Sequence, residues 1–148
     1  MGFVVDIKGR KSHDIIDDGL RILERLEHRG ARGADASSGD GAGILVQIPH
    51  DFFRRECEVL GFSLPPVGSY GVGMVFAHRY ETLRNKQKAI FGKTLFAKKV
   101  KVVLGWRESA GRFPCLGAEA AAIRPWLIQI FIGKGDNIMN DEEFEAKL

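Results

Sequence analysis

The residues with the strongest chemical signal lie between positions 28 and 43, in the stretch HRGARGADASSGDGAG. Glycine and other small residues are too frequent here for regular secondary structure. Glycine-rich loops often bind phosphate through backbone N–H groups, but such loops follow a strand and open a helix. Here the glycines precede an apolar run, and Ile44-Leu45 stands where a phosphate loop has Lys followed by Ser or Thr. The pattern therefore favours a shaped loop over a nucleotide site.

This 148-residue chain has two cysteines, Cys57 and Cys115. On their own they form neither a disulfide framework nor a metal site, and we expect no metal in this segment. Cys57 falls on a predicted helix face, and Cys115 lies in a loop after a proline. For each of them we favour a small packed cysteine over a nucleophile.

Composition limits the class of protein. Hydrophobic residues make up 45% and charged residues 28%, as in globular proteins, and no apolar run is long enough to span a membrane. The N-terminus MGFVVDIKGRK is apolar and then charged, the reverse of a signal peptide. The net charge of +3 comes with no nucleic-acid-binding signature, so we interpret the lysines of KTLFAKKVK as a solvated surface. We expect a cytoplasmic protein that binds neither nucleic acid nor membrane.

The elements that must position these residues are helices alternating with strands. Ser12 is expected to cap the first helix, and Gly30 to end it in a left-handed conformation. The apolar face of this helix consists of Ile15, Ile16, Leu20, Leu23 and Leu26. Further helices are expected at 50–60, 80–91 (ended by Gly92), 116–123 and 141–148, and strands at 3–7, 44–48, 69–77, 100–106 and 126–132. This alternation leaves a parallel sheet and a layered α+β sandwich both open.

The order of these features resembles one known family. GFVVDIKG, an amphipathic helix and HRGARGADASSGDGAGILVQIPHDFF are similar to the start of glutamate synthase large chains. That start is a class II glutamine amidotransferase domain of the N-terminal-nucleophile hydrolase type. YGVGMVF, VLGWR, LGAEA and IQIFIG follow in the family's order, so the resemblance covers essentially all of residues 1–148. It implies a single partial domain of the α+β class, part of a four-layer αββα sandwich.

The chemistry that the resemblance implies is hydrolysis of the glutamine side-chain amide to glutamate and ammonia. In that family an N-terminal cysteine attacks the amide carbon, and its own α-amino group, with a pKa of about 8, moves the proton. The family opens Cys-Gly-Val-Gly-Phe-Val, so Met1 falls on the third position and the nucleophilic cysteine is absent upstream of it. We therefore expect a domain truncated at both ends, which contains no catalytic residue and is inactive as written.

The resemblance also points to residues that support the active site or bind substrate. Arg29 matches the family's His-Arg-Gly arginine, which lies beside the nucleophile; the alternative is a helix-end cation that interacts with the helix dipole. His28 either supports the site or caps helix carbonyls. Asp35 and Asp40 match loop residues of the family, and Asx turns explain both equally well.

The resemblance implies glutamine as the substrate and the remaining glutamate synthase domains as partners, with ammonia used to make glutamate from 2-oxoglutarate. FMN, an iron–sulfur cluster and NAD(P)H or ferredoxin are expected only in the parent enzyme, and no cofactor is expected in this segment. Two alternatives stay open. One is a non-catalytic binding module derived from the amidotransferase fold, and the other is a fragment that does not fold stably.

Overall fold

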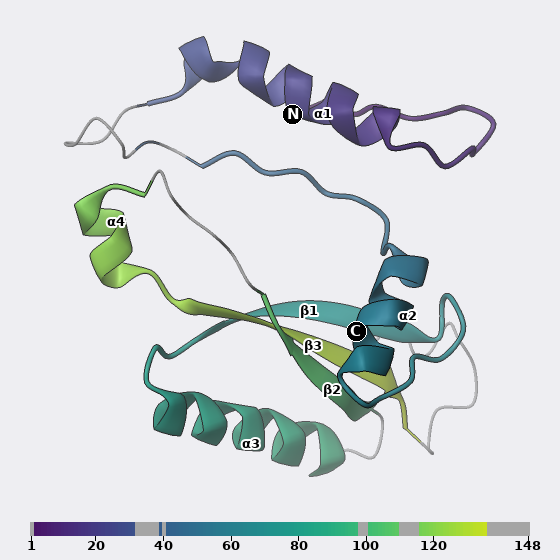
Figure 1. Ribbon diagram of the computed structural model, residues 1–148, viewed down its shortest axis with the longest axis vertical. Helices are drawn as coiled ribbons and strands as arrows, with labels where there is room; N and C mark the ends of the chain where they lie inside the picture. Colours follow the sequence, from purple (N-terminus) through teal and green to yellow (C-terminus); the bar gives the residue numbers. More distant parts are fainter. Residues whose placement is uncertain (1, 32–38, 40, 98–100, 110–115, 136–148) are drawn as a thin grey trace. The chain divides into compact units, whose positions relative to one another are not determined.

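The computed structural model describes residues 2–31, 39, 41–97, 101–109 and 116–135, which divide into two compact units (Figure 1). Unit 1 comprises residues 1–47 and 113–123. Unit 2 comprises residues 48–112 and 124–148. The helix expected at 141–148 lies outside the described residues.

Unit 1 contains the helices α1 (Asp14–Arg25) and α4 (Ala118–Ile123) and the short 3₁₀ turn η1 (Glu27–Arg29). The predicted cap at Ser12 is wrong by one residue, because the N-cap of α1 is His13, which makes no side-chain cap hydrogen bond. The Ser12 hydroxyl accepts the N–H of Asp14, the first helical residue, at 3.1 Å. The predicted left-handed stop at Gly30 is wrong, because Gly30 is extended, with φ −78° and ψ 152°. The helix ends instead by tightening into η1, where the Gly30 N–H donates to the Glu27 carbonyl at 2.9 Å.

The strands expected at 3–7 and 44–48 are also wrong, because neither segment has strand structure. A strand needs partners for its N–H and C=O groups on a neighbouring chain segment. The two ladders among the described residues join β1, β2 and β3 of unit 2 and involve neither segment. Their apolar side chains stay exposed as a result: Ile7 and Leu45 are each 99% exposed.

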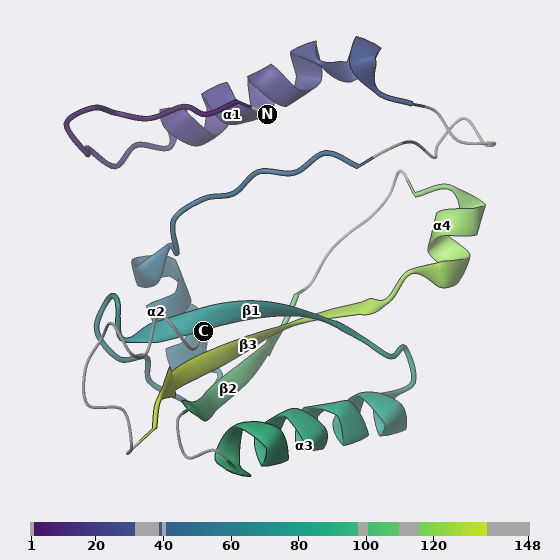
Figure 2. The ribbon, with the colours of Figure 1, turned by 180° about the vertical axis from the view of Figure 1, so that it is seen from behind.

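Unit 2 is built on a three-stranded antiparallel sheet with the order β1–β3–β2 (Figures 1 and 2). Its strands lie close to three of the predicted ones: β1 (Tyr70–Ala77), β2 (Lys101–Glu108) and β3 (Trp126–Lys134). The central strand β3 pairs with β1 along the whole of β1, and its pairing with β2 is irregular between Val103 and Gly105. The described residues therefore combine helices with an antiparallel sheet, which excludes a parallel sheet for these three strands.

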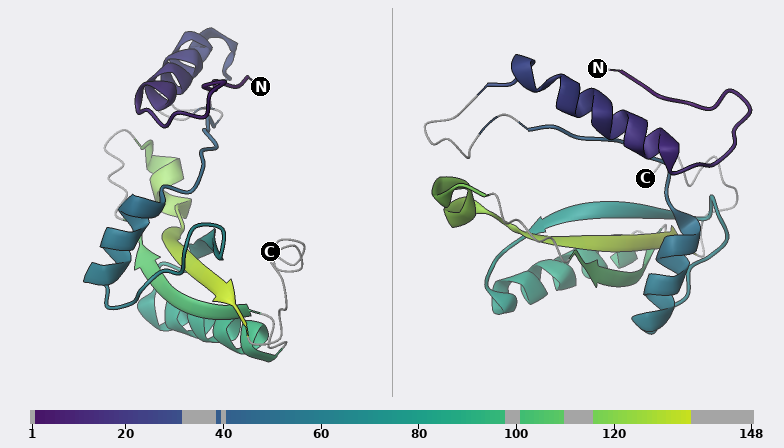
Figure 3. Two further views of the ribbon diagram at one scale, coloured as in Figure 1. Left: turned by 90° about the vertical axis from the view of Figure 1, so that its right-hand side faces the viewer. Right: turned by 45° about the horizontal axis from the view of Figure 1, so that its top comes forward.

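Helices α2 (His50–Val59) and α3 (Glu81–Ala97) pack on opposite faces of this sheet (Figure 3). Phe53 of α2 contacts Phe131, which pairs with Gly105 of β2. Phe91 of α3 contacts Trp106, the next residue of β2, at 5.9 Å between ring centroids. Because successive side chains of a strand point to opposite faces, the two helices lie on different sides.

The two helices of unit 2 end differently from each other. α2 ends as predicted, and Gly61 just beyond it takes a left-handed φ of +86° that favours glycine. α3 runs through Gly92 to Ala97, so the predicted end at 91 is wrong. Glycine weakens a helix interior by only about 1 kcal/mol, and the adjacent Phe91 contacts Trp106 of the sheet.

The core of unit 2 lies between α2 and the sheet. It consists of Phe53, Cys57, Tyr70 and Phe131, with Cys57 and Phe131 fully buried. The rings of Phe53 and Phe62 lie 5.2 and 5.6 Å from that of Phe131, and such aromatic pairs contribute about 0.5–1.5 kcal/mol each beyond their area. Every buried apolar side chain of the described core belongs to unit 2.

A charged contact holds α2 on the same face of the sheet. Arg107 of β2 donates to Glu56 of α2 from Nε at 3.0 Å and from Nη2 at 2.8 Å. Its Nη1 donates to the Gln129 side chain at 2.9 Å. All three contacts are with other parts of unit 2, so the guanidinium joins a helix to two strands.

Candidate active site

A turn at residues 6–10 reverses the N-terminal segment. The Asp6 carboxylate accepts the N–H of Lys8 at 2.8 Å and two bonds from the Arg10 guanidinium at 2.9 and 3.1 Å. Gly9 has a φ of +69°, which few residues other than glycine adopt. The hydrogen bonds from Arg10 lower the pKa of the Asp6 carboxyl below its usual value. The segment before the turn, including Gly2, is thereby directed toward α1.

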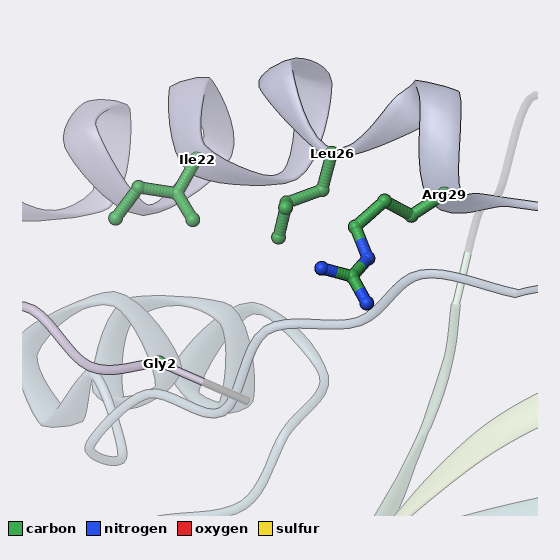
Figure 4. Close-up of a pocket in the computed structure, with 4 residues that line it drawn as sticks. All are labelled: Gly2, Ile22, Leu26 and Arg29. Carbon is green, nitrogen blue, oxygen red and sulfur yellow. The ribbon is translucent and has the colours of Figure 1, made fainter.

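Gly2 lines one side of an open hollow of about 480 Å³, and α1 with η1 lines the other (Figure 4). The lining residues from the helix side are Ile22, Leu26 and Arg29. Their spacing of four and three residues places them on one side of the helix. Figure 4 shows the three side chains pointing toward the segment that carries Gly2. The hollow therefore has an apolar wall that ends in one guanidinium.

This arrangement can bind a small polar molecule. A guanidinium is permanently charged and offers five donors in a planar fork, so Arg29 can hold a carboxylate or carbonyl oxygens in a fixed orientation. Ile22 and Leu26 offer apolar surface to a short aliphatic stem. The hollow is open to solvent on the described residues, and all four lining residues are accessible.

The structure separates the two neighbouring residues of the predicted site. Arg29 lines the hollow, whereas His28 does not. The His28 Nδ1 lies 3.0 Å from the carbonyl oxygen of Arg25. A carbonyl only accepts, so this contact is a hydrogen bond in the tautomer that carries the proton on Nδ1. Asp35 and Asp40 lie outside the described residues.

Cys57 has the properties of a packed cysteine, as predicted. It lies in α2 with 0% of its surface exposed, next to Tyr70 in the core of unit 2. Burial raises the pKa of its thiol, which disfavours the thiolate that a nucleophile or a metal ligand needs. Cys115 lies outside the described residues.

The described side chains include no group of three or more His, Cys, Asp or Glu residues that could hold a metal ion. An iron–sulfur cluster is commonly held by four cysteine thiolates, and the whole sequence has two cysteines. The residues of this chain therefore do not fit such a cluster. Within the described ranges, the helices are all too short or too polar to cross a membrane.

Sequence analysis missed two of the residues that line the hollow. Ile22 belongs to a stripe that continues through Leu26 to Arg29, and its spacing from Arg29 was a usable signal. Gly2 carried no such signal. Its place beside α1 depends on the turn around Asp6, and the periodicity of the sequence does not predict the hydrogen bonds of that turn.

Comparison with known proteins places this chain in a family. Residues 1–148 match the family model described as glutamine amidotransferases class-II. The chain is 42% identical, over its whole length, to the glutamate synthase [NADPH] large chain of Bacillus subtilis, of which the match covers 10%. It is 35% identical over its whole length to glutamate synthase [NADH] of Schizosaccharomyces pombe, covering 7% of that protein. It is 33% identical over 89% of its length to ferredoxin-dependent glutamate synthase 2 of Arabidopsis thaliana, covering 8%. The chain thus spans about a tenth or less of these relatives.

Proposed function

Since this chain belongs to the class II glutamine amidotransferase family, we propose that it forms part of a glutaminase domain within a glutamate synthase. The domain hydrolyses glutamine to glutamate and ammonia. The observation that supports the proposal is the position of Arg29, the family's site arginine, in a hollow that the N-terminal segment also lines. In this family the nucleophile is carried by that same segment.

The proposed nucleophile is a cysteine two positions before Met1, as the family's opening sequence implies. Two residues lie between it and Gly2, and three residue-to-residue steps of extended chain correspond to about 10 Å. The α-amino group takes the thiol proton, the thiolate attacks the amide carbon, and the same proton passes to the departing nitrogen to release ammonia. Water then hydrolyses the γ-glutamyl thioester and restores the thiol. Arg29 holds a carboxylate or loop carbonyls beside the reacting atoms.

Three further positions belong to the proposed site. Asp35 and Asp40 match loop residues of the family and would shape the loop that follows Arg29. His28 supports the site from η1, just after α1. The proposed domain includes all of residues 1–148 and continues beyond them.

The proposed architecture of the domain is the four-layer αββα sandwich of N-terminal-nucleophile hydrolases. The antiparallel sheet with α3 on one face supports one sheet and one helical layer. Helix α2 lies on the other face, where the second sheet of the sandwich would pack. The apolar segments 3–7 and 44–48 have no strand partner and are largely exposed, and they would become strands when partners are available.

The proposed partners are glutamine and the remaining domains of a cytoplasmic glutamate synthase, which use the ammonia to convert 2-oxoglutarate to glutamate. FMN, the iron–sulfur cluster and the electron donor would be bound by those domains. The relatives are named as NADPH-, NADH- or ferredoxin-dependent, so the donor differs within the family.

A chimera tests the proposal. Cys-Gly is placed before Met1, Met1 is changed to Val, and the sequence that follows the matched region in the Bacillus subtilis relative is appended after Leu148. Ammonia release from glutamine is then measured. We expect activity, and we expect Arg29→Lys to lower kcat/KM by about 10- to 100-fold, because a charged hydrogen bond contributes about 1.5–3 kcal/mol.

The matched control is Arg21→Lys, which makes the same change on the same helix. Arg21 is exposed and lies 3.6 Å from Asp18, away from the residues that line the hollow. This variant should keep the activity of the chimera. Absence of ammonia release from a folded chimera would refute the proposal, and glutamine binding without release would favour the non-catalytic module.

A further inference from the structure

We propose that His28 is a positioning residue, which caps the end of α1 and thereby directs Arg29 into the hollow without touching substrate. The inference rests on the proposed function of the same site. It assigns a role to a residue whose side chain faces the helix end and not the hollow.

The direction of Arg29 is set by the change from α1 to η1. The Leu26 N–H is shared between the carbonyls of Ile22 at 3.2 Å and Leu23 at 3.1 Å, and the Arg29 N–H donates to Leu26 at 2.9 Å. A 3₁₀ turn has three residues per turn, so residues three apart lie directly above one another. In an α-helix they are offset by about 60°. The tightening therefore aligns Arg29 with Leu26, which lines the hollow.

His28 replaces the hydrogen bond that this tightening removes. In a continued α-helix, the Arg29 N–H would donate to the carbonyl of Arg25. Here that N–H donates to Leu26, and the Arg25 carbonyl receives the Nδ1–H of His28 at 3.0 Å. The side chain thus supplies a donor to the helix end and favours η1 over one more α-helical turn. Losing this donor would let Arg29 rotate away from the hollow.

The cap makes no use of proton transfer. The Nδ1–H is present both in one neutral tautomer and in the imidazolium, so the bond to Arg25 persists when the ring is protonated. A positive ring would also interact favourably with the helix C-terminus. Asparagine places a side-chain N–H at a similar distance from the backbone as Nδ1, so His28→Asn can keep the bond, whereas His28→Ala cannot.

Kinetics of the chimera described above test the proposal. We expect His28→Ala to lower kcat/KM by about 3- to 10-fold and His28→Asn to stay within about twofold of the parent. The loss should be the same factor from about pH 6 to pH 9, since no proton transfer is involved. In an Arg29→Lys background, His28→Ala should lower kcat/KM by less than about twofold. The reason is that His28 acts by positioning the Arg29 guanidinium, which this background lacks.

Three results would overturn the proposal. The first is an equal loss of kcat/KM in His28→Ala and His28→Asn, and the second is an undiminished effect of His28→Ala in the Arg29→Lys background. The third is the disappearance of the acidic or the basic side of the pH profile of kcat/KM in His28→Ala. The last would make His28 an acid–base catalyst. A second measurement does not depend on activity. Nitrogen-15 NMR of histidine-labelled 148-residue chain should show neutral His28 as the Nδ1–H tautomer, and the Nε2–H tautomer would contradict the cap. An inactive parent chimera that shows the Nδ1–H tautomer would refute the glutaminase function and leave the cap intact.

Discussion

Replacing Gly105 by alanine should disturb the core of unit 2 at a defined point. A Cβ at this position would lie 2.4 to 2.6 Å from three atoms of the Phe62 ring. Carbon atoms pack at about 3.5–4.0 Å, so the ring must move by about 1 Å or more. Phe62 is partly buried and packs against Phe131, so the ring can move only by giving up part of that contact.

The expected cost follows from these contacts. Overpacking a core lowers the free energy of unfolding by about 1–3 kcal/mol. Replacing Gly by Ala also reduces the entropy of the unfolded chain, which raises the free energy of unfolding by about 0.4–1 kcal/mol. The central values of these two effects differ by about 1 kcal/mol. We therefore expect Gly105→Ala to lower the free energy of unfolding of unit 2 by about that amount, or its Tm by roughly 4–8 °C, as for domains of about 60–100 residues.

The matched control is Gly92→Ala, in the interior of α3. A Cβ there meets nothing within 4 Å. Alanine should therefore stabilise the helix by about 0.5–1 kcal/mol. Both variants are measured by urea unfolding followed by tryptophan fluorescence, since Trp106 and Trp126 lie in the sheet of unit 2. A neutral Gly105→Ala would refute the packing of Phe62, and a destabilising Gly92→Ala would refute the continuous α3.

In a Cys115→Ser background, the thiol of Cys57 should resist alkylation until urea unfolds unit 2. Burial both shields this thiol from the reagent and raises its pKa. Rapid labelling of the folded chain would contradict this. Burial raises the pKa values of both Cys57 and Tyr70, so the folded state keeps these protons to higher pH than the unfolded state does. The free energy of unfolding should therefore fall as pH rises past the ordinary thiol pKa of 9.0. Urea unfolding measured at several pH values checks the sign. Ile7→Gln and Leu45→Gln remove apolar side chains that are each 99% exposed, so light scattering should show less association, and no change would refute their exposure. The 148-residue chain itself should release no ammonia from glutamine, because neither of its cysteines has a free α-amino group, and turnover abolished by Cys115→Ser would contradict this.

Sequence reasoning located elements whose signals are local. The apolar spacing of α1 and α2 and the β-branched runs of β2 and β3 identify these elements without reference to the rest of the chain. Residues 3–7 and 44–48 have the same apolar character as β3, but a strand also requires a partner. Propensity reports on the residue, whereas pairing depends on distant parts of the chain.

At the end of α3, a local signal predicts a helix end where the structure has none. Gly92 predicts a stop, yet Lys88 and Phe91 both lie against Trp106 of β2 and hold the helix on the sheet. Tertiary contacts therefore override the local cost of a glycine. Arg29 was found through its motif, and its partners in the hollow depended on the turn at Asp6 and on η1.

Trapping of a covalent intermediate tests the central claim most directly. The chimera with Cys-Gly before residue 1 is mixed with glutamine, quenched in acid within the first turnover and digested, and its peptides are analysed by mass spectrometry. A glutaminase of this family should carry a γ-glutamyl thioester on the N-terminal peptide, and Arg29→Lys should reduce its rate of formation. An unmodified N-terminal peptide in a chain that still releases ammonia, or an adduct on Cys57 or Cys115, would contradict the account.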